Sequence, residues 1–146
     1  MATIDNPVIL VVEDDPPVRD LLDDVLKDEG YAVVAVHDGA SALQVITSLR
    51  VDLITLDLDL PGLTGSELLQ ILRTRKVPIP PVIVVTAEKP VRRKIRQMAQ
   101  AVVMKPFDVD EFVREVLNLL PRRTAHAQAR LDQLNETLKE RRAGRD

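Results

Sequence analysis

The sequence predicts an α/β domain in which five short parallel strands alternate with five amphipathic helices, with one extra helix at the C-terminus. Short apolar runs rich in β-branched residues recur along the chain, as is typical of strands that are buried on both faces of a sheet. The segments between these runs carry apolar residues at the three- and four-residue spacing of a helix that covers a sheet. Because the connections are short, each strand–helix–strand unit implies two parallel strands joined by a right-handed crossover.

Five segments have the strand pattern: residues 8–12, 31–36, 53–58, 81–87 and 101–104. The first is an uninterrupted apolar run, which indicates burial on both faces. Such a sheet commonly takes either the dinucleotide-binding order or the flavodoxin-like order. No Gly-x-Gly-x-x-Gly motif follows the first strand, so we expect the flavodoxin-like doubly wound sheet with strand order 2-1-3-4-5.

Five segments have the helix pattern: residues 16–30, 38–49, 64–76, 90–100 and 108–120. Two prolines open the first of them, and Gly30 suits the position just after its last turn. Thr64 with Glu67, and Asp108 with Glu111, have the spacing of capping boxes. The predicted helix starts therefore agree with the periodicity of the apolar residues.

The composition is that of one globular domain: 146 residues, of which 45% are hydrophobic and 29% charged. Aromatic residues make up only 2%, which argues against single-stranded nucleic-acid binding by base stacking. The net charge of −3 gives no overall attraction to nucleic acid or to anionic membranes, so we expect neither as a direct partner. The absence of cysteine, of an apparent signal peptide and of a long apolar run agrees with a cytoplasmic location.

The domain is expected to cover residues 6–120, followed by a polar helical tail or linker at 121–146. Five tail residues keep the alternating spacing of a coiled coil: Thr124, Ala127, Leu131, Leu134 and Leu138. We therefore expect a contact between two chains, a homodimer through the C-terminal helix. The alternative is that the three leucines fold back onto the surface of their own domain.

Chemically active residues follow the strands, and the carboxyl ends of parallel strands meet at one edge of a sheet. These residues are Glu13, Asp14 and Asp15 after strand one, Asp57 at the end of strand three with Asp59 just beyond, Thr86 at the end of strand four, and Lys105 after strand five. Clustered carboxylates make an oxygen-lined site that suits Mg²⁺. A carboxylate in such a site can attack phosphorus, while a lysine neutralises the phosphoryl oxygens.

The motifs "ILVVEDD", "DLITLDLDLPGLTG", "VIVVTA" and "MKPF" stand in this order on the expected elements. Together they resemble the receiver domain of bacterial two-component response regulators, over about residues 6–120. The resemblance implies a signalling switch rather than an enzyme for other substrates. A sensor histidine kinase would donate a phosphoryl group to Asp57, and the altered surface would bind a downstream protein that the sequence does not identify.

The resemblance also implies a role for each site residue. Asp14 and Asp57 would bind Mg²⁺ directly, Glu13 would help to hold the ion, and the backbone carbonyl of Asp59 would be a further ligand. Thr86 would be the switch hydroxyl. Lys105 would pair with the phosphoryl group, and the peptide bond between Lys105 and Pro106 would be cis.

Two features depart from the family pattern. The segment between Thr86 and Lys105 is short, so we expect helix four to lack about one turn. Val102 stands where relatives commonly carry an aromatic residue that moves with the switch hydroxyl, so this chain lacks the aromatic partner for coupling by that route.

Other interpretations are open for single features. The acids at 14 and 15 would also suit a helix N-terminus, and Asp59 would suit a turn. The basic run from Arg92 to Arg96 is better explained as a solvated helix face than as a nucleic-acid patch. The stretch "LDLDLPG" also resembles the Asp-x-Asp of haloacid-dehalogenase-type phosphatases, but it ends the third strand rather than the first. A pseudo-receiver that binds partners without phosphate is the third alternative.

Overall fold

The computed structural model describes residues 6–75, 78–121 and 125–144. The chain divides into two compact units, Met1–Lys105 and Pro106–Asp146, and each is described by itself. In the part of the chain that is described, no helix is both long and apolar enough to span a membrane.

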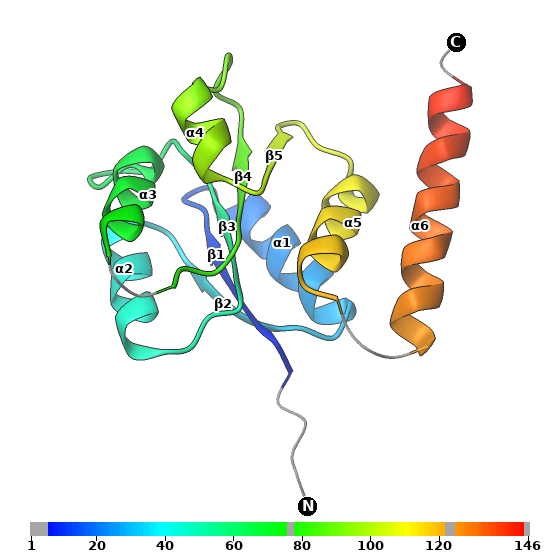
Figure 1. The fold of residues 1–146 in the computed structure, drawn as a ribbon, viewed down its shortest axis with the longest axis horizontal. Helices are drawn as coiled ribbons and strands as arrows, with labels where there is room; N and C mark the ends of the chain where they lie inside the picture. Colours follow the sequence, from blue (N-terminus) through cyan, green and yellow to red (C-terminus); the bar gives the residue numbers. More distant parts are fainter. Residues whose placement is uncertain (1–5, 76–77, 122–124, 145–146) are drawn as a thin grey trace, which may run out of the picture. The chain divides into compact units, whose positions relative to one another are not determined.

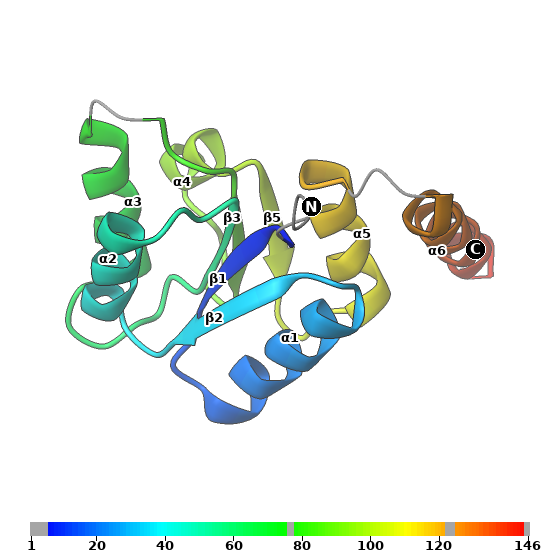
Figure 2. The ribbon, with the colours of Figure 1, turned by 90° about the horizontal axis from the view of Figure 1, so that it is seen from below.

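The first unit contains one parallel sheet with strand order β2-β1-β3-β4-β5, which confirms the predicted flavodoxin-like topology (Figure 1). Its strands are β1 (Val8–Val12), β2 (Ala32–Val36), β3 (Leu53–Leu56), β4 (Val82–Thr86) and β5 (Ala101–Met104). Its helices are α1 (Pro16–Asp28), α2 (Gly39–Ser48), α3 (Gly65–Thr74) and α4 (Arg93–Met98). Figure 2 shows α2, α3 and α4 on one face of the sheet and α1 on the other.

The central strands are buried on both faces, as their uninterrupted apolar sequences predict. On one face, alternate residues of β1, β3 and β4 join α2, α3 and α4 in a single core; examples are Leu10, Ile54 and Val84. On the face of α1, that helix buries Leu22 and Leu26. The edge strand β2 has no fully buried residue, because only one of its sides is paired.

The helix ends follow the local sequence. Gly30 adopts φ of 93°, a left-handed conformation that glycine reaches without a Cβ penalty, just after α1. The Thr64 hydroxyl accepts a hydrogen bond of 3.1 Å from the Glu67 amide and so caps α3. Helix α4 has only 6 residues, which confirms the prediction of a shortened fourth helix.

The second unit consists of α5 (Val109–Leu119) and α6 (Ala125–Ala143), which lie in contact. Asp108 caps α5 by accepting a hydrogen bond from the Asp110 amide at 2.9 Å. Arg141 of α6 forms ion pairs with both Asp108 and Asp110, the second at 2.8 Å. These ion pairs join the C-terminal part of α6 to the N-terminal end of α5.

Two of the leucines that suggested a coiled coil are buried within the single chain: Leu134 is 1% exposed and Leu138 is 6% exposed. This agrees with the alternative that the leucines fold back onto their own chain, because both are buried in the unit formed by α5 and α6. Thr124 and the side chain of Ala127, the first two positions of the pattern, lie outside the described residues. A homodimer through α6 stays a prediction, and it would require these leucines to leave their present surroundings.

Candidate functional site

The sheet register brings three charged residues, Glu13, Asp57 and Lys105, to one edge of the sheet at the carboxyl ends of their strands. Each follows the last residue of its strand, and each strand hydrogen-bonds to its neighbour there. The Asp57 amide donates to the Val12 carbonyl at 3.0 Å, and the Lys105 amide donates to the Thr86 carbonyl at 2.8 Å. Glu13 is held in the same way, because its amide donates to the carbonyl of the last residue of β2 at 3.0 Å. Backbone pairing therefore fixes the spacing of the site.

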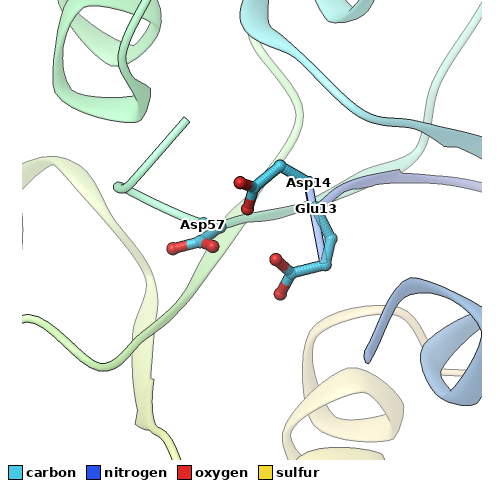
Figure 3. Close-up of side chains that lie close together, drawn as sticks. All are labelled: Glu13, Asp14 and Asp57. Carbon is cyan, nitrogen blue, oxygen red and sulfur yellow. The ribbon is translucent and has the colours of Figure 1, made fainter. Parts of the chain in front are cut away.

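Three carboxylates meet at this edge. Glu13, Asp14 and Asp57 each offer an oxygen, and these oxygens lie within 4.8 Å of one another. Figure 3 shows them turned toward a common space, Glu13 and Asp14 from the end of β1 and Asp57 from the end of β3. Glu13 is 1% exposed and Asp57 is 4% exposed, whereas Asp14 is exposed. The three carboxylates that the sequence predicted at this edge therefore lie close together in the structure.

Lys105 supplies the positive charge that two buried carboxylates require. Its Nζ donates a hydrogen bond of 3.1 Å to Asp57 Oδ2 and lies 2.5 Å from Glu13 Oε1. Lys105 and Asp57, 48 positions apart in the chain, thus meet at the edge where the sequence predicted both side chains.

The electrostatics show that these carboxylates repel one another. Burial, and then the contact with Asp57, raise the pKa of Glu13 to about 7, although Lys105 acts in the opposite direction. Burial disfavours the charged form of Lys105, but its hydrogen bond with Glu13 and the charge of Asp57 outweigh burial and raise its pKa. The site thus has an excess of negative charge that one lysine does not remove.

A divalent cation would meet this excess. The donor set consists only of carboxylate oxygens, the hard ligands that Mg²⁺ prefers, and the cluster is open to solvent on the side of Asp14. The residues present therefore fit the predicted magnesium site. Its ligands would be Asp14 and Asp57, with Glu13 beside them.

The remaining predicted residues lie around this centre. Thr86 is fully buried, and its hydroxyl accepts a hydrogen bond of 3.1 Å from the Glu88 amide. Asp59 is exposed, and its amide donates to Asp57 Oδ1 at 3.1 Å, so its backbone orients the central carboxylate. Asp15 occupies the N-cap position of α1, but its side chain forms no capping hydrogen bond.

One expectation from the family is wrong. Among the described residues the cis peptide bond is the one between Lys89 and Pro90, and the bond between Lys105 and Pro106 is trans. Either isomer is accessible before proline, because the preference for trans is only about 0.5–1 kcal/mol. Lys105 reaches both Glu13 and Asp57 from the trans peptide.

Two supporting residues were missed in the sequence. The Arg19 guanidinium donates to the carbonyl of Glu13 at 3.0 Å and to that of Asp14 at 3.4 Å, which ties the acidic loop to α1. Gly65 lies so close to the loop after β3 that a Cβ there would stand 2.3 Å from the Asp57 carbonyl oxygen. Neither contact has a local sequence pattern, because each depends on how a helix approaches a strand end.

Asp57 opens into a cavity of about 950 Å³. The lining comes from the loops that follow β1, β3, β4 and β5 and from the first turn of α3: Asp14, Asp15, Asp57, Leu58, Asp59, Thr64, Ser66, Glu67, Ala87, Glu88, Arg92 and Lys105. This is the edge at which doubly wound sheets bind ligands. The cavity connects the Asp57 carboxylate with the solvent.

Comparisons with known proteins agree with this geometry. A family model described as the response regulator receiver domain matches residues 9–117. The DNA-binding response regulator MtrA of Mycolicibacterium smegmatis is 39% identical over 109 residues, which are 74% of this chain and 48% of MtrA. The chain thus spans about half the length of the MtrA relatives that it matches.

Two further relatives are matched over nearly their whole length. Sporulation initiation phosphotransferase F of Bacillus subtilis is 35% identical over 119 residues, 80% of this chain and 95% of that protein. Among solved structures, the response regulator TrrA of Thermotoga maritima in complex with Mg(2+)-BeF has a TM-score of 0.72 at 35% identity. That match covers 78% of this chain and 99% of TrrA, which has also been solved in complex with the histidine kinase ThkA.

Proposed function

Because this chain belongs to the family of response regulator receiver domains, we propose that Asp57 accepts a phosphoryl group from a phosphohistidine of a sensor histidine kinase. The altered surface would then bind a downstream protein. The observation that carries this proposal is the contact of the buried Asp57 carboxylate with Lys105 Nζ at 3.1 Å, next to two further carboxylates. TrrA, a relative with a solved kinase complex, supports the kind of donor.

In the proposed reaction, an Asp57 carboxylate oxygen forms a bond to phosphorus as the bond from phosphorus to the donor breaks. With acetyl phosphate as donor, acetate leaves with the electron pair and no proton has to move. Lys105, already beside Asp57, would stay protonated and move to the phosphoryl oxygens. The Asp59 amide would keep Asp57 in its present orientation.

Asp14 and Asp57 would bind Mg²⁺ directly, with Glu13 and the backbone carbonyl of Asp59 completing the protein's part of the site. The ion, when bound, supplies charge neutralisation for the phosphoryl oxygens. Glu13 and Lys105 lie 2.5 Å apart as an ion pair, so Lys105 would keep Glu13 beside the two direct ligands.

Acetyl phosphate with Mg²⁺ tests the proposal. Intact-mass measurement should show one phosphoryl adduct, and EDTA should prevent it. A chain that takes no adduct would instead be a pseudo-receiver. Turnover of p-nitrophenyl phosphate would indicate a phosphatase of the haloacid-dehalogenase type, and we expect none because the described residues contain no cap domain over the cavity.

Lys105→Ala and Thr86→Ala should fail in different ways. Lys105 contacts Asp57 directly, so its loss should reduce phosphorylation, by about 10-fold or more. Thr86 holds the loop through the Glu88 amide, so Thr86→Ala should be phosphorylated while the amide shifts of that loop no longer respond to beryllofluoride. Thr86→Ser, which keeps the hydroxyl, is the control. Normal responses in both alanine variants would place the switch elsewhere.

We propose residues 6–120 as the receiver domain and residues 121–146 as a helical tail, in a protein of the cytoplasm. MtrA is named as a DNA-binding regulator, but this chain matches only half of it, and we assign no nucleic-acid contact to the present residues. The tail is proposed to form a homodimer only after leaving its place beside α5.

Sedimentation with and without beryllofluoride should therefore show self-association of the activated full chain, and none for a chain that ends at Leu120. Arg141→Ala removes the ion pairs to Asp108 and Asp110 and should favour the dimer, whereas the neighbouring Arg142→Ala should not. A full chain that stays monomeric in every case would leave α6 as a permanent cover of α5.

A further inference from the structure

The cavity over Asp57 is strongly acidic. Six of its lining residues carry carboxylates: Asp14, Asp15, Asp57, Asp59, Glu67 and Glu88. Only two cations line it, Lys105 and Arg92. A phosphate donor that enters this space carries negative charge of its own, so the acidic lining opposes its approach.

Lys105 is already committed, because it pairs with both Glu13 and Asp57. Arg92 differs. Within the part of the chain that the structure describes, its guanidinium forms no ion pair and no hydrogen bond, and its backbone carbonyl accepts the Arg96 amide at 3.1 Å. Arg92 is therefore the cation of the cavity that has free donors to offer an incoming anion.

The packing of α4 explains why Arg92 faces the cavity and its neighbours do not. Val91 is 5% exposed and Ile95 is 4% exposed, and both belong to the core beneath the helix. These two anchors fix the first turn and leave Arg92 at the cavity wall. Arg93 and Lys94 are exposed as well but do not line the cavity. The basic run thus divides into one cavity residue and a solvated face.

We propose that Arg92 binds the phosphoryl oxygens of the incoming donor and holds the donor over Asp57. A guanidinium presents several N–H groups in one plane and suits a phosphate better than an ammonium does. The inference rests on the proposed function, since it names a further residue for the same transfer. Arg92 keeps its proton, the bond from Asp57 to phosphorus forms as the bond to the leaving group breaks, and acetate departs from acetyl phosphate with the electron pair.

Phosphorylation kinetics of the full chain with acetyl phosphate and Mg²⁺ give the first readout. Arg92→Ala should lower the second-order rate constant by about three- to tenfold, and Arg92→Glu should lower it further. Arg92→Lys should restore part of the rate. Arg93→Ala, the matched control one residue away, should behave as the wild type. Added salt should slow the wild type more than Arg92→Ala, because salt screens the attraction between Arg92 and the anionic donor, which the variant no longer has.

The second readout does not depend on transfer. In the Asp57→Asn chain with Mg²⁺, acetyl phosphate should shift the amide resonances of Ala87 and Glu88, and adding Arg92→Ala should weaken this binding by a similar factor. If Arg92→Ala matches Arg93→Ala in this binding measurement, the assignment of Arg92 is overturned whether or not Asp57 accepts phosphate. A wild type without any adduct, but with Arg92-dependent binding, would overturn the proposed function and keep the donor site.

Discussion

Asp57→Asn is expected to abolish the phosphoryl adduct that acetyl phosphate and Mg²⁺ produce. The amide is nearly the same size as the carboxylate but has no nucleophilic anion, and the loss should be on the order of 10³-fold or more, as for other removed nucleophiles. The measurement is intact mass over time. The fold should survive this substitution. It removes one of three crowded carboxylates, and the buried Glu13 still pairs with Lys105.

Asp59→Asn is the matched control. Asp59 lies two residues further along the same loop and lines the same cavity, but its side chain is exposed and only its amide contacts Asp57. We expect this variant to take the adduct. An adduct that persists in Asp57→Asn, or that disappears only in Asp59→Asn, would contradict the assignment of the phosphoacceptor.

Gly65→Ala should be the most damaging small substitution outside the acidic cluster. The new Cβ would stand 2.3 Å from the Asp57 carbonyl oxygen and 2.7 Å from the Leu58 Cα, and both atoms belong to backbone that cannot rotate away. Alanine favours a helix over glycine by about 1 kcal/mol, but the clash opposes that gain. We expect the free energy of unfolding to fall by about 1–3 kcal/mol, measured by urea denaturation.

The same clash should displace the loop that carries Asp57, so phosphorylation should slow as well. Gly144→Ala is the control, since a Cβ there would have its nearest neighbour at 3.6 Å, an ordinary contact. If Gly65→Ala were as stable and as readily phosphorylated as Gly144→Ala, the close approach of α3 to the end of β3 would not position the site.

The sequence by itself determined the sheet, its strand order and the edge at which the site lies. All three follow from local patterns: apolar runs define buried strands, helical spacing defines the covering helices, and parallel strands align their carboxyl ends. Glu13, Asp57 and Lys105 were predictable for the same reason, because each directly follows a strand. The short α4 was also visible, since the length of the segment before β5 limits the helix.

Only the tertiary structure decided which side chains contact one another across these elements. Three such contacts depend on how helices approach strand ends. The Arg19 side chain binds the backbone of the acidic loop, Gly65 lies close to the Asp57 carbonyl, and Arg92 lines the cavity. The trans peptide before Pro106 was likewise not readable, because proline permits both isomers at similar free energy. In the tail, the spacing of the leucines defines an apolar stripe but not what covers it, and only the structure shows Leu134 and Leu138 buried in the unit that α6 forms with α5.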